Sequence, residues 1–182
     1  MPPTDAIATP FPAKGSGVPR RRFLYLAAGV AGAGAAAAIA VTLLQPGVET
    51  FGPPLDVDLK PLKPGQAITV VWGGKPIFVR RRTAAEIERA RNDDTQPLPD
   101  PARDTTRVQR PEWLVLVGVC THESCVPLGQ QASDPRGDYG GWFCTCHGSH
   151  FDTSGRVRKG PALHNLAVPP YRFVDETTLR LG

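Results

Sequence analysis

Two short segments hold nearly all the residues of this chain that could bind a metal. Residues 120–125 read Cys-Thr-His-Glu-Ser-Cys, and residues 144–150 read Cys-Thr-Cys-His-Gly-Ser-His. Together they contain all four cysteines and three of the four histidines. A Cys-x-His pair and a Cys-x-x-His pair, with 21 residues between them, supply two thiolates and two imidazoles. One further cysteine is left over in each segment.

Three chemistries use such a set. A tetrahedral zinc site takes two cysteines and two histidines, but the one-residue gap in the first pair is tight, and two cysteines stay unexplained. Two disulfides would use every cysteine and leave the histidines incidental. A Rieske centre binds one iron of a [2Fe–2S] cluster through two cysteines and the other through two histidines. It accounts for every cysteine if the spare pair, Cys125 and Cys146, forms a disulfide.

The two segments resemble the cluster-binding boxes of the Rieske iron–sulfur subunits of ubiquinol–cytochrome c reductase, the cytochrome bc complex. The resemblance continues upstream at residues 74–79, Gly-Lys-Pro-Ile-Phe-Val, and downstream at residues 154–162 and 165–171. It therefore covers most of the chain from about Arg20 onward. The two boxes alone are a very specific pattern.

The resemblance implies which residues meet the two irons. Cysteines bind the inner iron and histidines the outer iron, and the four ligands are Cys120, Cys144, His122 and His147. It also implies a disulfide between Cys125 and Cys146. We expect His150 to lie in the second loop without metal contact and His164 to lie at the surface.

The same resemblance implies an electron-transfer function. In this family, the histidine that matches His147 hydrogen-bonds the hydroxyl of a quinol, which gives one electron to the cluster and a proton to the histidine. The head then carries the electron to the haem of the cytochrome c subunit, and the second electron goes to the cytochrome b subunit. The expected cofactor is a Rieske-type [2Fe–2S] cluster. The expected partners are the two cytochrome subunits, quinol and the membrane.

Other residues are expected to tune the cluster. By resemblance, Gly160 and Pro161 belong to a loop that shields the cluster from water, and Ser149 donates a hydrogen bond to a bridging sulfide. Phe151 replaces a tyrosine whose hydroxyl donates to the sulfur that matches Cys120. Because such bonds favour the reduced cluster, we expect this cluster to be a weaker oxidant than those of close relatives.

The sequence departs from the family pattern at the loop tips. Glu123 and Ser124 replace an apolar residue and a glycine at the tip that docks on cytochrome b. Thr145 and Leu163 each replace a proline. None of these positions is a ligand, so the changes bear on docking strength and reduction potential.

The start of the chain resembles an export signal followed by a membrane helix. Residues 1–22 are expected to be a cytoplasmic tail, ending in the Arg-Arg-x-Phe-Leu form of a twin-arginine signal. Residues 23–44 carry no charge and span roughly 30 Å as a helix, enough to cross a bilayer. A cleaved signal peptide is the alternative, but the length of the apolar stretch favours a retained anchor.

The topology and the linker follow from the flanking residues. Basic residues precede the anchor and acidic residues follow it, which predicts a cytoplasmic amino terminus and a periplasmic head. The protein is therefore expected in a bacterial inner membrane, with a single pass. Residues 45–54 are rich in proline and glycine, and we expect them to be a hinge linker.

Residues 55–182 are expected to form a mainly β, antiparallel Rieske head with one short helix and both cluster loops at one end. Thr83, with Glu86 three residues on, predicts a capped helix that runs to about Arg91. Residues 92–110 are expected to be a loop. The predicted strands are 67–72 and 77–81, joined across Gly73 and Gly74, then 113–119, 142–143, 171–174 and 178–180.

Composition and two related protein classes complete the prediction. The net charge is only +4 and much of it is local, so nothing argues for nucleic acid. The small subunit of arsenite oxidase is also an exported Rieske protein, but residues 74–79 and 156–171 fit the bc family better. The ferredoxin of an aromatic-ring dioxygenase lacks both the spare cysteines and the anchor.

Overall fold

The computed structural model describes residues 51–182 of the chain. The predicted tail, the predicted anchor and residues 45–50 of the predicted linker lie outside the described residues. No helix between residues 51 and 182 is long and apolar enough to cross a bilayer. The last residues of the predicted linker pack on the head, since Phe51 stacks on Trp72 with ring centroids 4.5 Å apart. The Trp72 Nε1 also donates to the Pro53 carbonyl at 2.7 Å.

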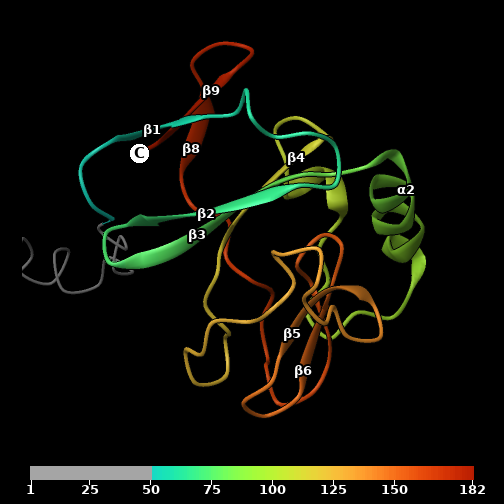
Figure 1. Ribbon diagram of the computed structural model, residues 1–182. Helices are drawn as coiled ribbons and strands as arrows, with labels where there is room; N and C mark the ends of the chain where they lie inside the picture. The colour runs from blue at the N-terminus through green and yellow to red at the C-terminus, as the bar shows by residue number, and fades with distance from the viewer. Residues whose placement is uncertain (1–50) are drawn as a thin grey trace, which may run out of the picture. The chain divides into compact units, whose positions relative to one another are not determined.

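In this part of the chain, nine strands form three antiparallel sheets (Figure 1). The sheets have the strand orders β1-β9-β8, β2-β3-β4 and β5-β6-β7. The strands are β1 (Leu55–Asp58), β2 (Ala67–Trp72), β3 (Lys75–Arg81), β4 (Trp113–Val117), β5 (Gly140–Cys144), β6 (Ser149–Asp152), β7 (Val157–Lys159), β8 (Tyr171–Phe173) and β9 (Thr178–Leu181).

The middle sheet is covered on both faces, which explains its sequence. All five residues of β4, Trp-Leu-Val-Leu-Val, are buried, although neighbouring side chains of a strand point to opposite faces. Val115 and Val117 pack in one apolar cluster with residues of β1 and β9. Leu114 and Leu116 pack in a second cluster with residues of β5 and β6. A strand with two buried faces shows a continuous apolar run rather than alternation.

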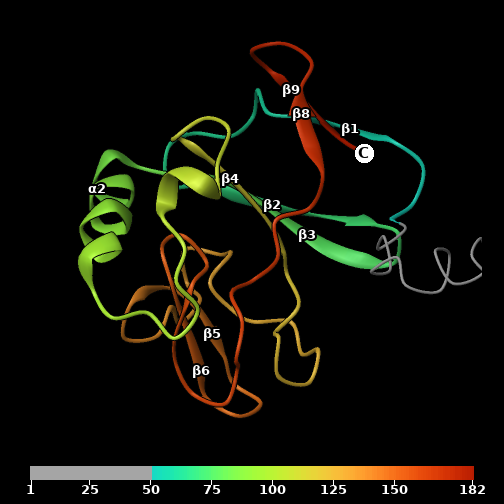
Figure 2. The same ribbon diagram turned by 180° about the vertical axis from the view of Figure 1, so that it is seen from behind.

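The three sheets follow one another along the head. In both views, the sheet of β1, β8 and β9 lies at the upper end and the β5–β6 pair at the lower end (Figures 1 and 2). The sheet of β2, β3 and β4 lies between them. The predicted hairpin of β2 and β3 is confirmed, with Trp72 paired to Lys75 across a two-residue turn. Gly73 and Gly74 both have positive φ there, as the favoured hairpin turn requires.

The helix α2 (Ala84–Asn92) begins where the sequence predicted it. The Thr83 hydroxyl accepts from the Glu86 backbone amide, and the Glu86 carboxylate accepts from the Thr83 backbone amide. The other carboxylate oxygen of Glu86 accepts from Arg80 of β3 and, at 3.0 Å, from Arg136. Glu86 thus caps the helix and also bonds it to the middle sheet and to the segment before β5.

The long loop after α2 contains two short 3-10 helices, η1 (Asp93–Thr95) and η2 (Asp104–Thr106). Its aspartates pair with buried arginines. Asp104 binds Arg82, with 2.6 Å between Oδ1 and Nη1 and both side chains fully buried, and it accepts from the Ser154 hydroxyl at 2.7 Å. Asp94 pairs with Arg156. The loop is therefore an ordered cover that joins the middle sheet to the third sheet.

The other predicted strands are confirmed to within two residues at each end, and two differences have a physical reason. β4 ends at Val117 rather than at residue 119. The Gly118 amide still donates to the Pro76 carbonyl of β3, but proline has no N–H to donate in return, so the ladder stops there. Three strands, β1, β6 and β7, were missed. Each has three or four residues, too few to show an alternating pattern.

Candidate metal centre

Two loops from different elements bring the cysteine and histidine side chains together. The second loop begins directly at the end of β5, at Cys144, and returns into β6 at Ser149. The first loop begins after β4, and Cys120 is reached through an irregular link rather than directly from the strand end, as had been expected. Cys120 and Cys144 are each only 2% exposed, and both are free thiols.

Backbone hydrogen bonds close both loops. In the first, the Ser124 amide donates to the Cys120 carbonyl at 3.0 Å, and the Cys120 amide donates to the Cys125 carbonyl at 2.8 Å. Ser124 has φ 60°, the one positive value outside glycine in the described residues. In the second, the Gly148 amide donates to the Cys144 carbonyl at 2.9 Å. Each loop is a tight turn of defined shape.

A disulfide between Cys125 and Cys146 ties the two loops to each other, as predicted. It links residues 21 apart in the sequence. Because the other two cysteines are free and buried beside it, the disulfide separates the four cysteines into a structural pair and a pair available as ligands.

The two predicted histidine ligands lie side by side at the surface of these loops. The rings of His122 and His147 are 4.7 Å apart between centroids and nearly perpendicular. The side chain of His147 is 46% exposed, and its Nε2 lies 3.6 Å from Oε2 of Glu123. The donor set therefore has a buried sulfur side and an exposed nitrogen side.

This set fits a [2Fe–2S] cluster of the Rieske type. Burial, and then the hydrogen bond with Cys120, raises the pKa of the Cys144 thiol, while backbone amides of Cys146 and His147 act in the opposite direction. A bound metal would replace the thiol protons. The same backbone amides would then donate to the thiolate sulfur. Two buried sulfurs and two exposed imidazoles are the donors that the two irons of such a cluster take.

A third loop covers the site. The Ala162 amide donates to the Ser149 hydroxyl at 3.1 Å, which leaves the hydroxyl hydrogen of Ser149 free to donate elsewhere. The Thr121 hydroxyl donates to the His164 carbonyl at 2.6 Å. Gly160 packs so closely that a Cβ there would lie 2.5 Å from the Gly148 carbonyl oxygen. The segment with Gly160 and Pro161 thus lies against both ligand loops.

Aromatic side chains pack beneath the cysteines. Phe151 and Trp142, both fully buried, belong to the same apolar cluster as Cys120 and Cys144. The Trp142 Nε1 donates to the Gln130 side chain at 3.2 Å. The sulfur side of the site is therefore dry and rigid.

The remaining histidines have other surroundings. His150 lies in β6 rather than in the loop, which corrects the sequence-based expectation of its place. Its Nδ1 accepts from the Asp138 amide at 3.0 Å, and its ring packs on Phe143. The side chain of His164 is 75% exposed, as expected for a surface residue.

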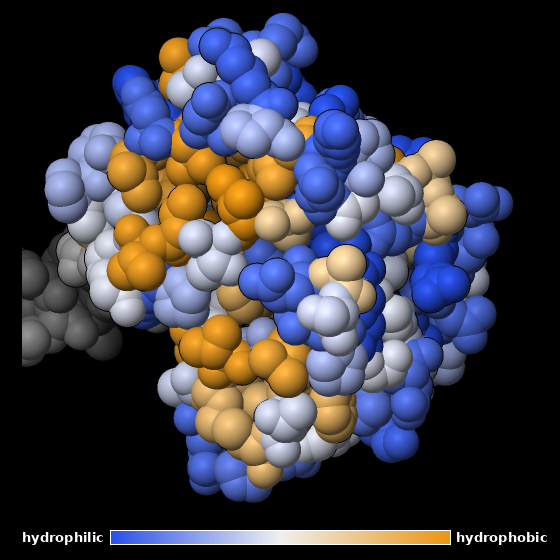
Figure 3. Space-filling view, viewed as in Figure 1, coloured by the Kyte–Doolittle hydropathy of each residue, from blue (hydrophilic) through white to orange (hydrophobic). Residues whose placement is uncertain are grey.

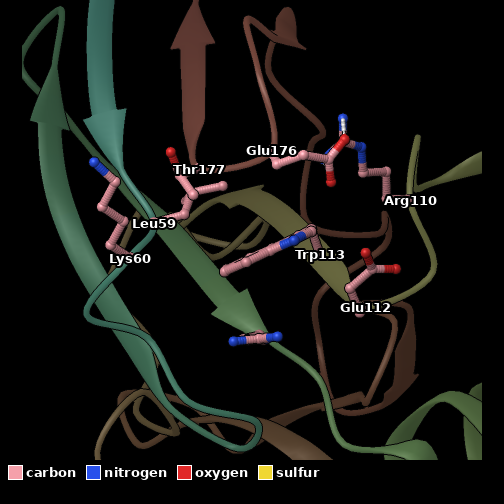
Figure 4. A pocket seen from close by; sticks show the side chains of 8 residues that line it. Leu59, Lys60, Arg110, Glu112, Trp113, Glu176 and Thr177 are labelled. Carbon is pink, nitrogen blue, oxygen red and sulfur yellow. Dashed lines mark hydrogen bonds and ion pairs between the residues drawn. The ribbon is translucent and has the colours of Figure 1, made fainter.

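A separate hollow of about 290 Å³ lies away from the ligand loops (Figure 4). Trp113 forms part of its wall, and the ion pair of Arg110 and Glu176 lies at its edge. None of the candidate ligands lines it. It is therefore no part of the proposed redox site.

Comparison with known proteins agrees with this geometry. The Rieske [2Fe-2S] domain family matches residues 56–171. The iron–sulfur subunit of ubiquinol–cytochrome c reductase from Rhodospirillum rubrum is 52% identical over 167 residues, which cover 90% of this chain and 91% of that protein. This chain belongs to the Rieske iron–sulfur subunits of ubiquinol–cytochrome c reductase.

Two further relatives and a second family agree. The Blastochloris viridis subunit is 51% identical to this Rieske subunit over 170 residues, which cover 90% of the chain and 92% of that protein. The mitochondrial cytochrome b-c1 complex subunit Rieske-1 of Arabidopsis thaliana is 56% identical over 128 residues, which cover 70% of the chain and 45% of that protein. Residues 12–45 match the family described as "Ubiquitinol-cytochrome C reductase Fe-S subunit TAT signal".

The sequence located the ligand boxes of this Rieske subunit but not their supports. Thr121 and Asn165 were not singled out, yet Asn165 accepts from the Val157 amide at 2.9 Å and donates to Asp100. The signal that could have found such supports is the set of aspartates in the loop after α2. These aspartates pair with arginines that lie just after β3 and just before β7.

Proposed function

We propose that this Rieske subunit takes one electron from quinol at a cytochrome b subunit and passes it to the haem of a cytochrome c subunit. The observation that supports this most directly is the arrangement of the donors. Two buried thiols face inward and two imidazoles face solvent at one end of the head. A redox centre built in this way is insulated on one side and open to a substrate on the other.

The residues have distinct roles in this proposal. Cys120 and Cys144 bind the inner iron, and His122 and His147 bind the outer iron. When bound, the cluster supplies a one-electron acceptor whose potential is raised by the neutral imidazole ligands. The exposed ring of His147 hydrogen-bonds the quinol hydroxyl and accepts its proton. Ser149, Phe151 and the third loop set the polarity around the sulfurs.

In this proposal, residues 1–44 direct export of the head and anchor it to the membrane. The match of residues 12–45 to a family named for a twin-arginine signal supports export of the folded, cofactor-loaded head. In the proposal, residues 23–44 stay as a single-pass anchor in a bacterial inner membrane. Residues 1–22 remain in the cytoplasm, and the head lies in the periplasm on its linker.

Purification of the membrane complex tests the proposal. A tag on this chain should bring down b-type and c-type cytochromes, and the complex should reduce cytochrome c with quinol. His147→Ala should abolish this activity, whereas Glu176→Ala, which changes an exposed side chain far from the ligand loops in the sequence and in the fold, should keep it. Isolation of the chain with other redox subunits and no cytochromes would contradict the proposal.

A further inference from the structure

The three described segments that form and flank the ligand loops contain one charged side chain. Residues 118–133, 139–151 and 160–171 make up the loops and their flanks, and Glu123 is the single Asp, Glu, Lys or Arg among them. Exposed apolar side chains lie in the same segments, including Val126 and Leu163. Figure 3 shows a hydrophobic patch at this lower end of the head. Figure 3 also shows an apolar patch in the upper half of the head, so the lower patch is a candidate interaction site because it lies beside the ligand loops as well as because it is apolar.

Glu123 is held in place on this surface by a rigid loop. The turn of residues 120–125 is closed by backbone bonds and fixed by the disulfide at Cys125. The carboxylate is exposed, and its one ion-pair contact within residues 51–182 is the 3.6 Å approach to Nε2 of His147. That distance is longer than a hydrogen bond.

Basic residues next to the three segments are already paired. Lys159 lies 3.1 Å from Asp138, and Arg136 donates to Glu86. Among residues 51–182, no lysine or arginine pairs with Glu123, whose ion-pair contact is with His147. Burial of an unpaired carboxylate in an apolar interface is strongly unfavourable, so a stable complex needs a cation opposite it.

We propose that the partner surface that receives this tip is apolar and carries one arginine or lysine, which pairs with Glu123 and selects this head. The inference rests on the proposed function, under which that partner is the cytochrome b subunit. The pairing also draws the carboxylate away from Nε2 of His147, the atom that the quinol must reach. Glu123 is then a specificity residue for docking rather than a catalytic residue.

Three substitutions in the intact membrane complex test the proposal. Glu123→Gln keeps the shape and removes the charge, Glu123→Leu makes the tip wholly apolar, and Glu123→Lys reverses the charge. The rate of quinol oxidation should fall by about threefold or more in the Gln and Leu variants, because the partner cation is left without a carboxylate. It should fall by about tenfold or more in the Lys variant, because two like charges then face each other. The matched control is Glu176→Lys, which reverses an exposed glutamate outside the three segments.

The outcomes separate this inference from the proposed function. Each variant should keep the resonance signal of the cluster and copurify with both cytochromes. We expect that replacing the basic residue of cytochrome b by an acidic one restores activity to the Glu123→Lys variant and lowers the activity of the complex that contains Glu123. Wild-type activity in the assembled Gln, Leu and Lys variants would overturn the inference and leave the proposed function standing. A wild-type complex without cytochromes would overturn the proposed function itself.

Discussion

Among the residues, Phe151 is the one that we predict to lower the cluster potential relative to a tyrosine. It is fully buried in the apolar cluster that contains Cys120, and by family resemblance a tyrosine there would donate to the cysteine sulfur. Phe151→Tyr should raise the midpoint potential by on the order of tens of millivolts, since only part of a bond of about 1.5–3 kcal/mol differs between the redox states. A redox titration followed by the resonance signal measures this shift.

The control for this prediction is Phe173→Tyr, which adds the same hydroxyl in β8, in the sheet farthest from the ligand loops. It should leave the potential unchanged. An unchanged potential in Phe151→Tyr, in a structure where the new hydroxyl bonds the Cys120 sulfur, would contradict the account.

Two glycines near the site form a matched pair for a second test. Gly148 and Gly160 both have positive φ, but a Cβ on Gly148 meets nothing within 4 Å, whereas one on Gly160 meets the backbone of the second loop. Gly148→Ala should cost about 1–2 kcal/mol of unfolding free energy, from backbone strain alone. Gly160→Ala should cost more and should break the bond between Ala162 and Ser149.

Urea unfolding and the resonance signal would distinguish the two glycine variants. The Gly160 variant should show the larger loss of stability together with an altered signal, and the Gly148 variant should keep the native signal. Equal costs in the two variants would show that contact with the third loop is unimportant.

At the scale of residues, the sequence predicted the candidate donors and the disulfide, but it did not predict backbone angles or the bonds that support the loops. The donors and the disulfide followed from the two boxes and their resemblance. The left-handed φ of Ser124 could not be predicted, because it depends on closure of a turn by the Cys120 carbonyl. The bond from Thr121 to the third loop joins residues more than forty positions apart, and no local pattern encodes it.

Among the elements, the loop after α2 should be held by its buried ion pair. Asp104→Ala leaves the Arg82 guanidinium buried and without its carboxylate, so we expect a loss of about 3–5 kcal/mol in unfolding free energy. Glu176→Ala breaks an exposed pair with Arg110 and should cost at most about 1 kcal/mol. Chemical denaturation of both variants makes the comparison, and similar costs would contradict the role given to the loop.

The helix cap should make stability depend on pH. Burial alone would raise the pKa of Glu86, but the bond from the Thr83 amide and the charges of Arg80 and Arg136 outweigh it and hold the pKa below the ordinary value of 4.5. A lowered carboxyl pKa contributes stability above the unfolded-state value, and this contribution is lost as pH falls through the folded-state value.

Glu86→Gln should therefore destabilise the head at neutral pH by an amount that stays constant down to about pH 5.5 and shrinks as pH falls below 4.5. Unfolding free energies of the variant and the wild type, measured across this range, test the prediction. A difference that grows as the solution becomes more acidic would have the wrong sign.

Elements with a local signal were predictable, and elements made by distant pairing were not. The hairpin is signalled by two adjacent glycines, and α2 by two capping residues that are three positions apart. By contrast, β1 exists because Leu55 pairs with Leu181 at the far end of the chain. The four residues of β6, Ser-His-Phe-Asp, show no strand pattern of their own. They form a strand because β5 and β7 pair with them on either side.

For the whole head, the stacked sheets explain why one end is specialised. The upper and middle sheets share one apolar cluster, and the middle and lower sheets share another. The second ligand loop joins β5 and β6 of the lower sheet, and the first follows β4 of the middle sheet. The apolar cluster between these two sheets therefore supports both loops. A tip whose single charged side chain is the Glu123 carboxylate is then presented on a rigid body, as the proposed docking requires.

The central claim is that the two loops hold a [2Fe–2S] cluster through two thiolates and two imidazoles. The most direct measurement is the electron paramagnetic resonance spectrum of the reduced, purified protein, with nitrogen couplings resolved. The account predicts a Rieske-type signal with couplings from two histidines. His122→Ala or His147→Ala should abolish it, and His164→Ala should leave it unchanged. A full signal in either ligand variant, or a silent protein that contains zinc instead of iron, would contradict the account.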